Sequence, residues 1–480
     1  METLQRTANR GSVPTGYDID NSLKFERANG EQIFTSNAAA GNRRTWTFSA
    51  WIKRTQLSQD YSTVFSCGYS NIQFMSNDRP RLILYNGSSE VYADPEMLMR
   101  DTSAWYHIVV QVDSTQSTAS DRVKWWINGD RITDFNNSTY TNMSQNEEFD
   151  FGQAGSGSGN WLRLGEFFGG SEGFGGYMAD VYYLNGTAAQ ASDFGEYDSD
   201  SGIWIPKAYT GSGYGTQGFH YKFDNASNLG EDSSGEGHDA NNLNNITAAD
   251  QATDTPTNNF CTINPLIPYY GSVSEGATKF SHTSSGDGWE SFVATMGAGT
   301  SGKWYAEFKF VASGSVDNFI GICPIDDPDL NRGGASFSLY GGDTSLDESV
   351  GYYAANGQRY IAGSGAAYGN TWAITDIMSI AVDMDNGKLY FAKNGTWQNS
   401  GDPTSGATGT GALDVRGATK PQSLGASNYT SGQDILANYG GFTTISISSA
   451  ASDANGYGTF EYAPPSGYYA LCTKNLAEYG

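Results

Sequence analysis

Apolar and polar residues alternate in many short segments of this chain. In residues 45–54 (TWTFSAWIKR), Trp46, Phe48 and Ala50 fall on one side of an extended backbone. Residues 303–311 (KWYAEFKFV) place four apolar side chains on one side in the same way. A period of two residues is typical of a β-strand with one face against a core.

Segments of this kind recur along both halves of the chain and are separated by turn residues. In the first half they are STVFSCG, NIQFMS, RLILYNGS, WYHIVVQVDS, VKWWINGDRI, NWLRLGE and GYMADVYYLNG. In the second half they are TKFSHT, GWESFVATMG, NFIGICPI, SVGYYAANGQRYIAG, IMSIAVDMD, KLYFAKNG, TISISS and YYALCT. Only residues 188–197 (AAQASDFGEY) are predicted to be helical. The pattern predicts an all-β protein made of antiparallel β-sandwiches of the jelly-roll kind.

Asn-Gly pairs mark the tightest predicted turns. They occur at 128–129, 386–387 and 394–395, each between strand-like segments. Asn-Gly favours a two-residue hairpin turn because both residues tolerate positive φ. The hairpins in the two halves have different flanking sequences. They therefore indicate two separate β domains rather than two copies of one repeat.

The predicted organisation has four parts. Residues 1–21 are polar and aperiodic and are expected to form an extended N-terminal arm. Residues 22–205 and 269–480 are the two sandwiches. Residues 206–268 are rich in turn residues and are expected to form a bridge partly packed on its neighbours, with FHYKFD (219–224) as a candidate strand.

Charge and composition restrict the classes of partner. The 480 residues carry a formal charge of −25, and only 16% of them are charged. An acidic chain without a basic stripe is not expected to bind nucleic acid. No apolar run is long enough to insert in a membrane, and the N-terminus does not resemble a secretory signal. Synthesis and assembly in the cytoplasm are therefore expected.

The two halves resemble two known families. TWTFSAWIKR, WYHIVVQVD, VKWWINGDRI, LRLGE and GYMADVYYLNG, in this order, make residues 22–205 similar to the laminin-G-like, concanavalin A-type jelly rolls. GKWYAEFKF, FIGICP, SVGYYAANGQRY, DIMSIAVDMDNGKLYFAKNGTW and APPSGYYALC make residues 260–480 similar to SPRY domains. The first resemblance implies carbohydrate or protein binding through loops, and the second implies protein–protein contact.

The tandem arrangement and its bridge also resemble a class of bacteriophage virion proteins. This resemblance implies a non-enzymatic protein on the virion surface, such as a tail fibre or appendage that binds host surface glycans or proteins. Its arm would contact other virion proteins, and by analogy with fibres it would be a homotrimer. A capsid decoration protein anchored to the shell is the alternative, and a glycan-degrading enzyme is a further one.

Catalytic and metal-binding motifs are sparse in the sequence. We find no paired-carboxylate strand motif of glycosidases, nucleophile elbow, Walker loop or zinc signature. Four cysteines occur without a C-x-x-C pair. No cofactor is expected, with calcium as the alternative, and the weak metal candidates are Asp326, Asp327 and Asp329 in DDPDLN. The DMDNG segment (383–387) is interpreted as a turn.

Aromatic residues on loops are the candidate ligand-binding residues, because sugar sites use aromatic rings beside polar groups. The candidates are Tyr352, Tyr353, Tyr368, Phe167, Phe168 and Phe174. The alternative for the Gly/Phe-rich loop is packing against a neighbouring subunit. Tryptophans on alternating strands are predicted to be core residues, namely Trp46, Trp51, Trp105, Trp125 and Trp304.

Overall fold

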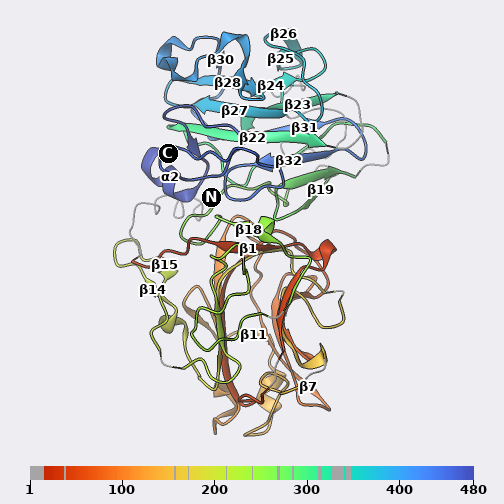
Figure 1. The fold of residues 1–480 in the computed structure, drawn as a ribbon, viewed down its shortest axis with the longest axis vertical. Coiled ribbons are helices and arrows are strands. Elements are labelled where there is room, and N and C mark those ends of the chain that lie inside the picture. Colours follow the sequence, from red (N-terminus) through yellow and green to blue (C-terminus); the bar gives the residue numbers. More distant parts are fainter. Residues whose placement is uncertain are drawn as a thin grey trace. The chain divides into compact units, whose positions relative to one another are not determined.

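The computed structural model describes residues 16–36, 39–155, 158–170, 172–211, 213–240, 242–267, 271–283, 286–311, 316–325, 340–341 and 348–480. These residues are nearly all β and form two compact units (Figure 1). The N-terminal unit ends at Thr257 and the C-terminal unit begins at Asn258. The predicted fold class, with tandem antiparallel sandwiches, is confirmed. Within the described residues, no helix is long and apolar enough to cross a membrane.

The first sheet of the N-terminal unit has the order β10-β9-β8-β3-β13-β1-β18, and β16 also pairs with β13. Its neighbouring strands are antiparallel. The strands are β1 (Ser22–Phe25), β3 (Thr45–Arg54), β8 (Trp105–Asp113), β9 (Val123–Ile127), β10 (Asp130–Ile132), β13 (Gly176–Asn185), β16 (Phe219–Tyr221) and β18 (Gln251–Ala252).

The second sheet of this unit has the order β11-β7-β6-β5-β4-β12-β2-β17. Its strands are β2 (Gln32–Thr35), β4 (Ser62–Cys67), β5 (Ser70–Phe74), β6 (Pro80–Tyr85), β7 (Glu90–Pro95), β11 (Phe135–Asn137), β12 (Leu162–Leu164) and β17 (Asn242–Asn244). The core lies between the two sheets, where Phe48 of β3 stacks on Phe65 of β4 with ring centroids 4.6 Å apart.

The outer face of the first sheet is covered as well. Trp46, Phe48 and Ala50 face the core as predicted, but Thr47 and Ser49 on the other side of β3 are also fully buried. The chain after β13 folds back over this side. The Thr47 hydroxyl donates to the carbonyl of Thr187 (2.8 Å), and Gln111 donates to that of Ala189 (2.9 Å).

The region expected to be a bridge supplies part of the N-terminal unit. Strand β16 confirms the candidate strand in FHYKFD, and β17 and β18 add to the edges of the two sheets. Asp254 reaches the sheet interior, where it accepts a 2.7 Å hydrogen bond from Lys53, and both side chains are at most 1% exposed. Trp105 donates its indole N–H to the same carboxylate (3.0 Å). Residues 206–257 are therefore integral to the first sandwich.

Residues 1–15 of the expected arm lie outside the described residues. Its last part is held on the N-terminal unit. Tyr17 donates its hydroxyl to Asp180 (2.9 Å), and Ile19 exchanges two hydrogen bonds with Thr257.

The helix expected at residues 188–197 was wrong. This segment contains one 3-10 turn, η5 (Ala191–Asp193), followed by strand β14 (Gly195–Tyr197), which pairs with β15 (Trp204–Pro206). Pairing with β15 and packing against Trp204 outweigh the weak helical pattern. The C-terminal α2 (Thr473–Tyr479) was not anticipated.

Short 3-10 turns connect other strands. They are η1 (Arg27–Asn29), η2 (Ala119–Asp121), η3 (Thr139–Asn142), η4 (Ser158–Asn160), η6 (Ala248–Asp250), η8 (Gln398–Ser400) and η9 (Pro403–Thr408).

The C-terminal unit contains a larger and a smaller sheet. The larger has the order β19-β20-β32-β22-β27-β28-β29, with β30 beside β28 and β33 parallel to β22. Its strands are β19 (Gly271–Ser274), β20 (Lys279–His282), β22 (Lys303–Val311), β27 (Ile377–Asp383), β28 (Lys388–Lys393), β29 (Thr396–Trp397), β30 (Leu413–Asp414), β32 (Asp434–Asn438) and β33 (Tyr469–Ala470).

The smaller sheet has the order β21-β31-β23-β24-β25-β26. Its strands are β21 (Glu290–Ser291), β23 (Asn318–Pro324), β24 (Val350–Tyr353), β25 (Gln358–Ile361), β26 (Ser364–Ala367) and β31 (Gln422–Asn428). The four alternating apolar residues of β22 lie in the core between the sheets, as their spacing predicts.

The predicted Asn-Gly turns are confirmed. Asn128–Gly129 joins β9 to β10 and Asn394–Gly395 joins β28 to β29, and all four residues have positive φ. The DMDNG segment is a turn between β27 and β28. Its Asp383 carboxylate accepts hydrogen bonds from Asn386 and pairs with Lys303 at 2.9 Å. These contacts occupy Asp383 as a turn and ion-pair residue.

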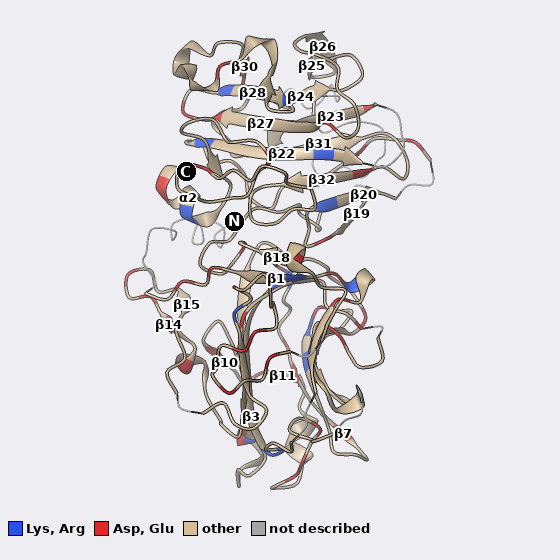
Figure 2. Ribbon diagram, in the orientation of Figure 1, with Lys and Arg blue, Asp and Glu red and all other residues tan. Residues whose placement is uncertain are grey.

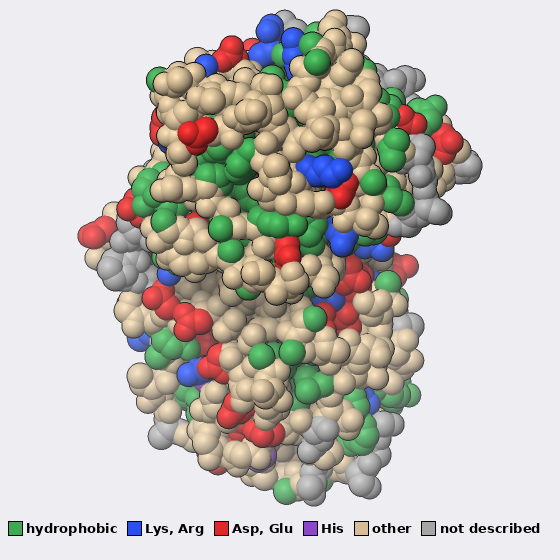
Figure 3. All heavy atoms as spheres, turned by 45° about the horizontal axis from the view of Figure 1, so that its top comes forward, with side chains coloured by type: hydrophobic (Ala, Val, Ile, Leu, Met, Phe, Trp, Pro, Cys, Tyr) green, Lys and Arg blue, Asp and Glu red, His purple; other side chains and the backbone are tan. Residues whose placement is uncertain are grey.

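The surface is mostly polar but uncharged. Figure 2 shows the Lys and Arg of the described residues spread over separate strands and loops. On the face shown in Figure 3, hydrophobic side chains form small patches among uncharged polar atoms. Such a surface suits contacts made by aromatic rings and neutral hydrogen bonds.

Candidate functional site

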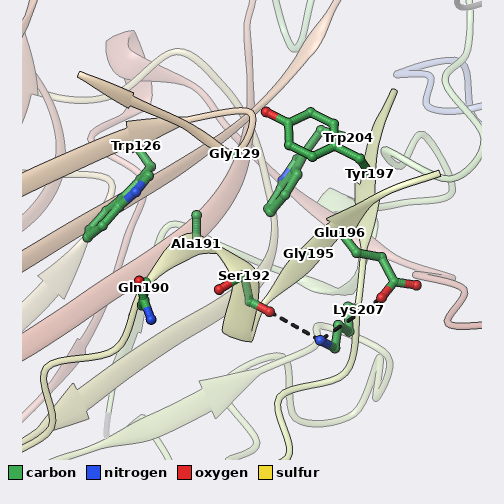
Figure 4. Close-up of a pocket in the computed structure, with 10 residues that line it drawn as sticks. All are labelled: Trp126, Gly129, Gln190, Ala191, Ser192, Gly195, Glu196, Tyr197, Trp204 and Lys207. Carbon is green, nitrogen blue, oxygen red and sulfur yellow. Dashed lines mark hydrogen bonds and ion pairs between the residues drawn. The ribbon is translucent and has the colours of Figure 1, made fainter. Parts of the chain in front are cut away.

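An aromatic pocket opens where the segment after β13 meets the β9–β10 hairpin (Figure 4). Its volume is about 320 Å³. Three aromatic rings and several polar side chains line it. The lining residues are Trp126, Gly129, Gln190, Ala191, Ser192, Gly195, Glu196, Tyr197, Trp204 and Lys207.

Strand alternation directs Trp126 toward this pocket. Trp125 and Trp126 are neighbours in β9, so their side chains leave opposite faces of the sheet. Trp125 is fully buried in the sandwich core, and Trp126 lies on the outer face. The guanidinium of Arg131, from β10, lies 5.1 Å from the Trp126 ring centroid and holds it by a cation–π contact.

Trp204 packs directly on two glycines. A Cβ at Gly129 would come 2.3 Å from the Trp204 ring, and a Cβ at Gly195 would come 2.5 Å from it. Gly129 also has a φ of +84°, which favours glycine. The hairpin glycine therefore serves the tight turn and leaves room for the indole.

A buried histidine fixes the orientation of Trp204. The Trp204 indole N–H donates to Nδ1 of His107 (3.0 Å). Because an indole can only donate, Nδ1 accepts, and Nε2 of His107 carries the proton toward Ser49 Oγ at 2.9 Å. Trp51 stacks on the imidazole at 4.8 Å. Burial lowers the pKa of His107 to about 3.

This histidine predicts a pH dependence of stability. His107 resists protonation in the folded protein but accepts a proton near pH 6.5 in the unfolded chain. Stability is therefore complete above pH 6.5 and falls as the pH decreases from 6.5 toward 3, by about 1.4 kcal/mol per pH unit. NMR titration should show no His107 protonation between pH 4 and 8. A midpoint near 6.5 would contradict this arrangement.

Polar groups form the rim of the pocket. Lys207 Nζ donates to the carbonyl of Ser192 (3.2 Å) and lies 4.0 Å from the carboxylate of Glu196. Tyr197 is 50% exposed and donates its hydroxyl to Asp130 (2.7 Å). This hydrogen bond raises the pKa of Tyr197 to about 12, so the phenol stays neutral. The rim thus combines paired charges with an exposed aromatic face.

Rings beside polar groups can hold a ligand that has both apolar and hydroxyl-bearing surfaces. The indoles and phenol can cover an apolar ring face, and Gln190, Glu196 and Lys207 offer hydrogen bonds at its edge. We find no group of three or more metal-ligating side chains among the described residues.

Comparison with known families identifies a domain in each unit. Residues 27–193 match the concanavalin A-like lectin/glucanases superfamily (Laminin_G_3), and residues 303–413 match the SPRY domain. The chain carries these two domains in tandem. The predicted resemblance to both families is confirmed. Comparison with curated proteins found no match.

Solved structures of both kinds are similar in fold. A human SPRY domain is 16% identical with a TM-score of 0.26, covering 35% of this chain and 94% of its own. A putative carbohydrate binding protein from Bacteroides ovatus is 14% identical with a TM-score of 0.33, covering 47% and 59%. A heptameric SAP-like pentraxin from Limulus polyphemus is 15% identical with a TM-score of 0.25, covering 35% and 77%.

Three of the six aromatic candidates lie in cores. Phe174 is fully buried in the concanavalin A-like sandwich beside Phe25. Tyr352 and Tyr368 lie in the core of the SPRY unit, where both contact Phe391. Their neighbouring glycines suggested loops, but the strand periods carry these rings inward. None of the three is available to a ligand in this conformation.

The other three candidates remain partly exposed. Phe167 and Phe168 lie together with ring centroids 4.7 Å apart, and the exposed Tyr69 joins them. Tyr353 lies in a separate cluster on the smaller SPRY sheet, where it stacks on Phe319 at 4.6 Å. Asp326, Asp327 and Asp329 lie outside the described residues.

Sequence reasoning missed the pocket residues Trp126, Tyr197 and Trp204. One signal was available, because two consecutive tryptophans in a strand must face opposite sides. If Trp125 is a core residue, Trp126 faces outward beside an Asn-Gly turn. No pattern in the sequence indicates that residues 187–207 fold back to this hairpin.

Proposed function

We propose that the protein is a non-enzymatic binding protein whose aromatic pocket holds a sugar ring of a surface glycan. The observation that carries this proposal is the convergence of Trp126, Tyr197 and Trp204 on one pocket with a polar rim. The concanavalin A-like and SPRY domains support a binding function in general.

The pocket's size and chemistry suit a small part of a glycan. Its volume lies at the lower end of the roughly 300–1,000 Å³ of small-molecule sites. Pyranose rings present apolar C–H faces, which aromatic rings cover, and equatorial hydroxyls, which amides and charged groups bind. Lys207 and Glu196 largely neutralise each other, so the site favours a neutral ligand over a strongly charged one.

Removing the exposed ring tests the pocket directly. Tyr197→Ala is expected to weaken binding at least tenfold in calorimetric titration with a hit from a neutral glycan panel, because the phenol covers one side of the ligand. Its half-exposed side chain makes a folding defect unnecessary. Tyr61→Ala is the matched control, since Tyr61 is 47% exposed in the same unit but does not line the pocket. Equal loss in both variants would contradict the proposal.

The biological setting that we propose is the surface of a bacteriophage virion, as a tail fibre or appendage that attaches to the host. The sequence resemblance of the tandem domains and their bridge supports this setting. In it, the arm contacts other virion proteins and the protein forms a homotrimer. The isolated protein should adsorb to host cells and block infection.

A capsid decoration protein is the second candidate, favoured by the polar N-terminal arm. Such a protein should bind empty capsids in a copy number set by shell symmetry, and removal of residues 1–21 should abolish this binding. A glycan-degrading enzyme is a third candidate. It should release reducing sugar from host polysaccharide, and no release across a glycan panel would exclude it.

A further inference from the structure

A second group of aromatic rings lies on the other sheet of the N-terminal unit. Tyr69 is in the β4–β5 turn, Tyr85 ends β6, and Phe167 and Phe168 follow β12. The Tyr69 ring centroid lies 5.1 Å from that of Tyr85 and 5.0 Å from that of Phe168. We call these four residues the aromatic cluster.

The aromatic cluster is exposed and yet fixed in place. Tyr69 is 51% exposed and the other three rings are half-buried. The backbone N–H of Tyr69 donates to Asp150 (2.8 Å). Glu166 accepts from the backbone N–H groups of Phe167 (2.9 Å) and Glu172 (2.7 Å), which shapes the loop beneath the rings. A ligand would therefore meet a pre-arranged surface, with little ordering cost.

The size of the aromatic cluster favours a small ligand over a protein. An aromatic side chain buries about 150–250 Å² in full, so four partly exposed rings offer on the order of 400 Å². A stable protein interface buries roughly 800 Å² on each partner. A second copy of this chain would also bring together two molecules of charge −25.

The edge of the aromatic cluster is polar and neutral in character. Asn86, Ser88 and Ser89 follow Tyr85 and form a hydrogen-bonded turn. The nearby carboxylates of Asp150 and Glu166 are engaged by backbone N–H groups. Apolar ring faces with neutral hydrogen-bonding groups at their edge match an uncharged saccharide.

We propose that the aromatic cluster is a second contact for neutral glycan, so that one N-terminal unit holds two glycan segments. This inference rests on the proposed function for the ligand class but on separate residues for the site. The aromatic pocket lies over the first sheet and the aromatic cluster lies on the second. A polymeric glycan can engage both, and its binding gains from the high effective concentration of the second segment.

The test uses the full chain in affinity gel electrophoresis with dextran, mannan, galactomannan and xyloglucan as probes. Relative to the wild type, Tyr69→Ala/Phe168→Ala is expected to weaken retention by the best polysaccharide at least tenfold. Tyr69→Phe keeps the ring and is expected to change retention less than twofold. Circular dichroism melting of each variant separates lost binding from lost fold.

Each outcome decides the inference. Wild-type retention of the double variant, or no retention of the wild type by any gel, overturns it. A lower oligomeric state of the double variant in sedimentation, with unchanged retention, shows a contact between copies and also overturns it. Loss in the double variant with normal retention of Tyr197→Ala supports the aromatic cluster and contradicts the pocket. Loss in both variants supports both sites.

Discussion

Replacing Asp254 by asparagine is expected to lower the free energy of unfolding of the N-terminal unit by about 3–5 kcal/mol. The carboxylate accepts from Lys53 at 2.7 Å and from the Trp105 indole at 3.0 Å, in a site where the Lys53 side chain is 0% exposed. Asparagine keeps the shape but leaves the ammonium without its counter-charge. Hydrogen exchange of the β3 and β8 amides measures this unit by itself.

Glu148→Gln is the matched control for this prediction. Glu148 pairs with Arg44 at 2.8 Å in the same unit, but both side chains are more than 40% exposed. Solvent screens such a pair, so the change is expected to cost less than about 1 kcal/mol. A similar small effect for Asp254→Asn would contradict the conclusion that residues 206–257 are integral to the first sandwich.

Replacing Gly129 by alanine is expected to weaken glycan binding at least tenfold and to destabilise the N-terminal unit. The added Cβ would lie 2.3 Å from the Trp204 ring, so the indole must move from its place against His107. The φ of +84° adds backbone strain of about 1 kcal/mol. Calorimetric titration and urea unfolding measure the two effects separately.

Gly202→Ala isolates the backbone strain from the loss of space. Gly202 has a φ of +67°, and nothing lies within 4 Å of the position that its Cβ would take. This variant is expected to lose about 1 kcal/mol of stability while keeping its affinity. If Gly129→Ala behaves like Gly202→Ala in both measurements, then the position of Trp204 does not determine binding.

The fold class could be predicted from the sequence because it depends on local patterns. Alternation in residues 45–54 and 303–311 identified core strands, and Asn-Gly pairs identified the hairpins. Both signals lie within a few residues of one another. Two-sheet packing then follows because each strand must bury its apolar face.

The candidate site could not be predicted in the same way, because it depends on contacts between distant segments. Trp204 reaches the hairpin at Gly129 only after residues 187–207 fold back over the first sheet. Glycine-rich surroundings suggested that Tyr368 and Phe174 were exposed, but both rings are buried by elements far away in the sequence. Phe167 and Phe168 were named correctly as exposed rings, without the partners Tyr69 and Tyr85.

Glycan recognition by the aromatic pocket is tested most directly by indole N–H resonances during titration with a bound neutral oligosaccharide. The account predicts that the Trp126 and Trp204 signals shift and saturate together, with the affinity that calorimetry gives. The buried Trp46 and Trp304 signals, which arise in the two cores, should not move. Saturable binding that leaves both Trp126 and Trp204 unshifted would contradict the account.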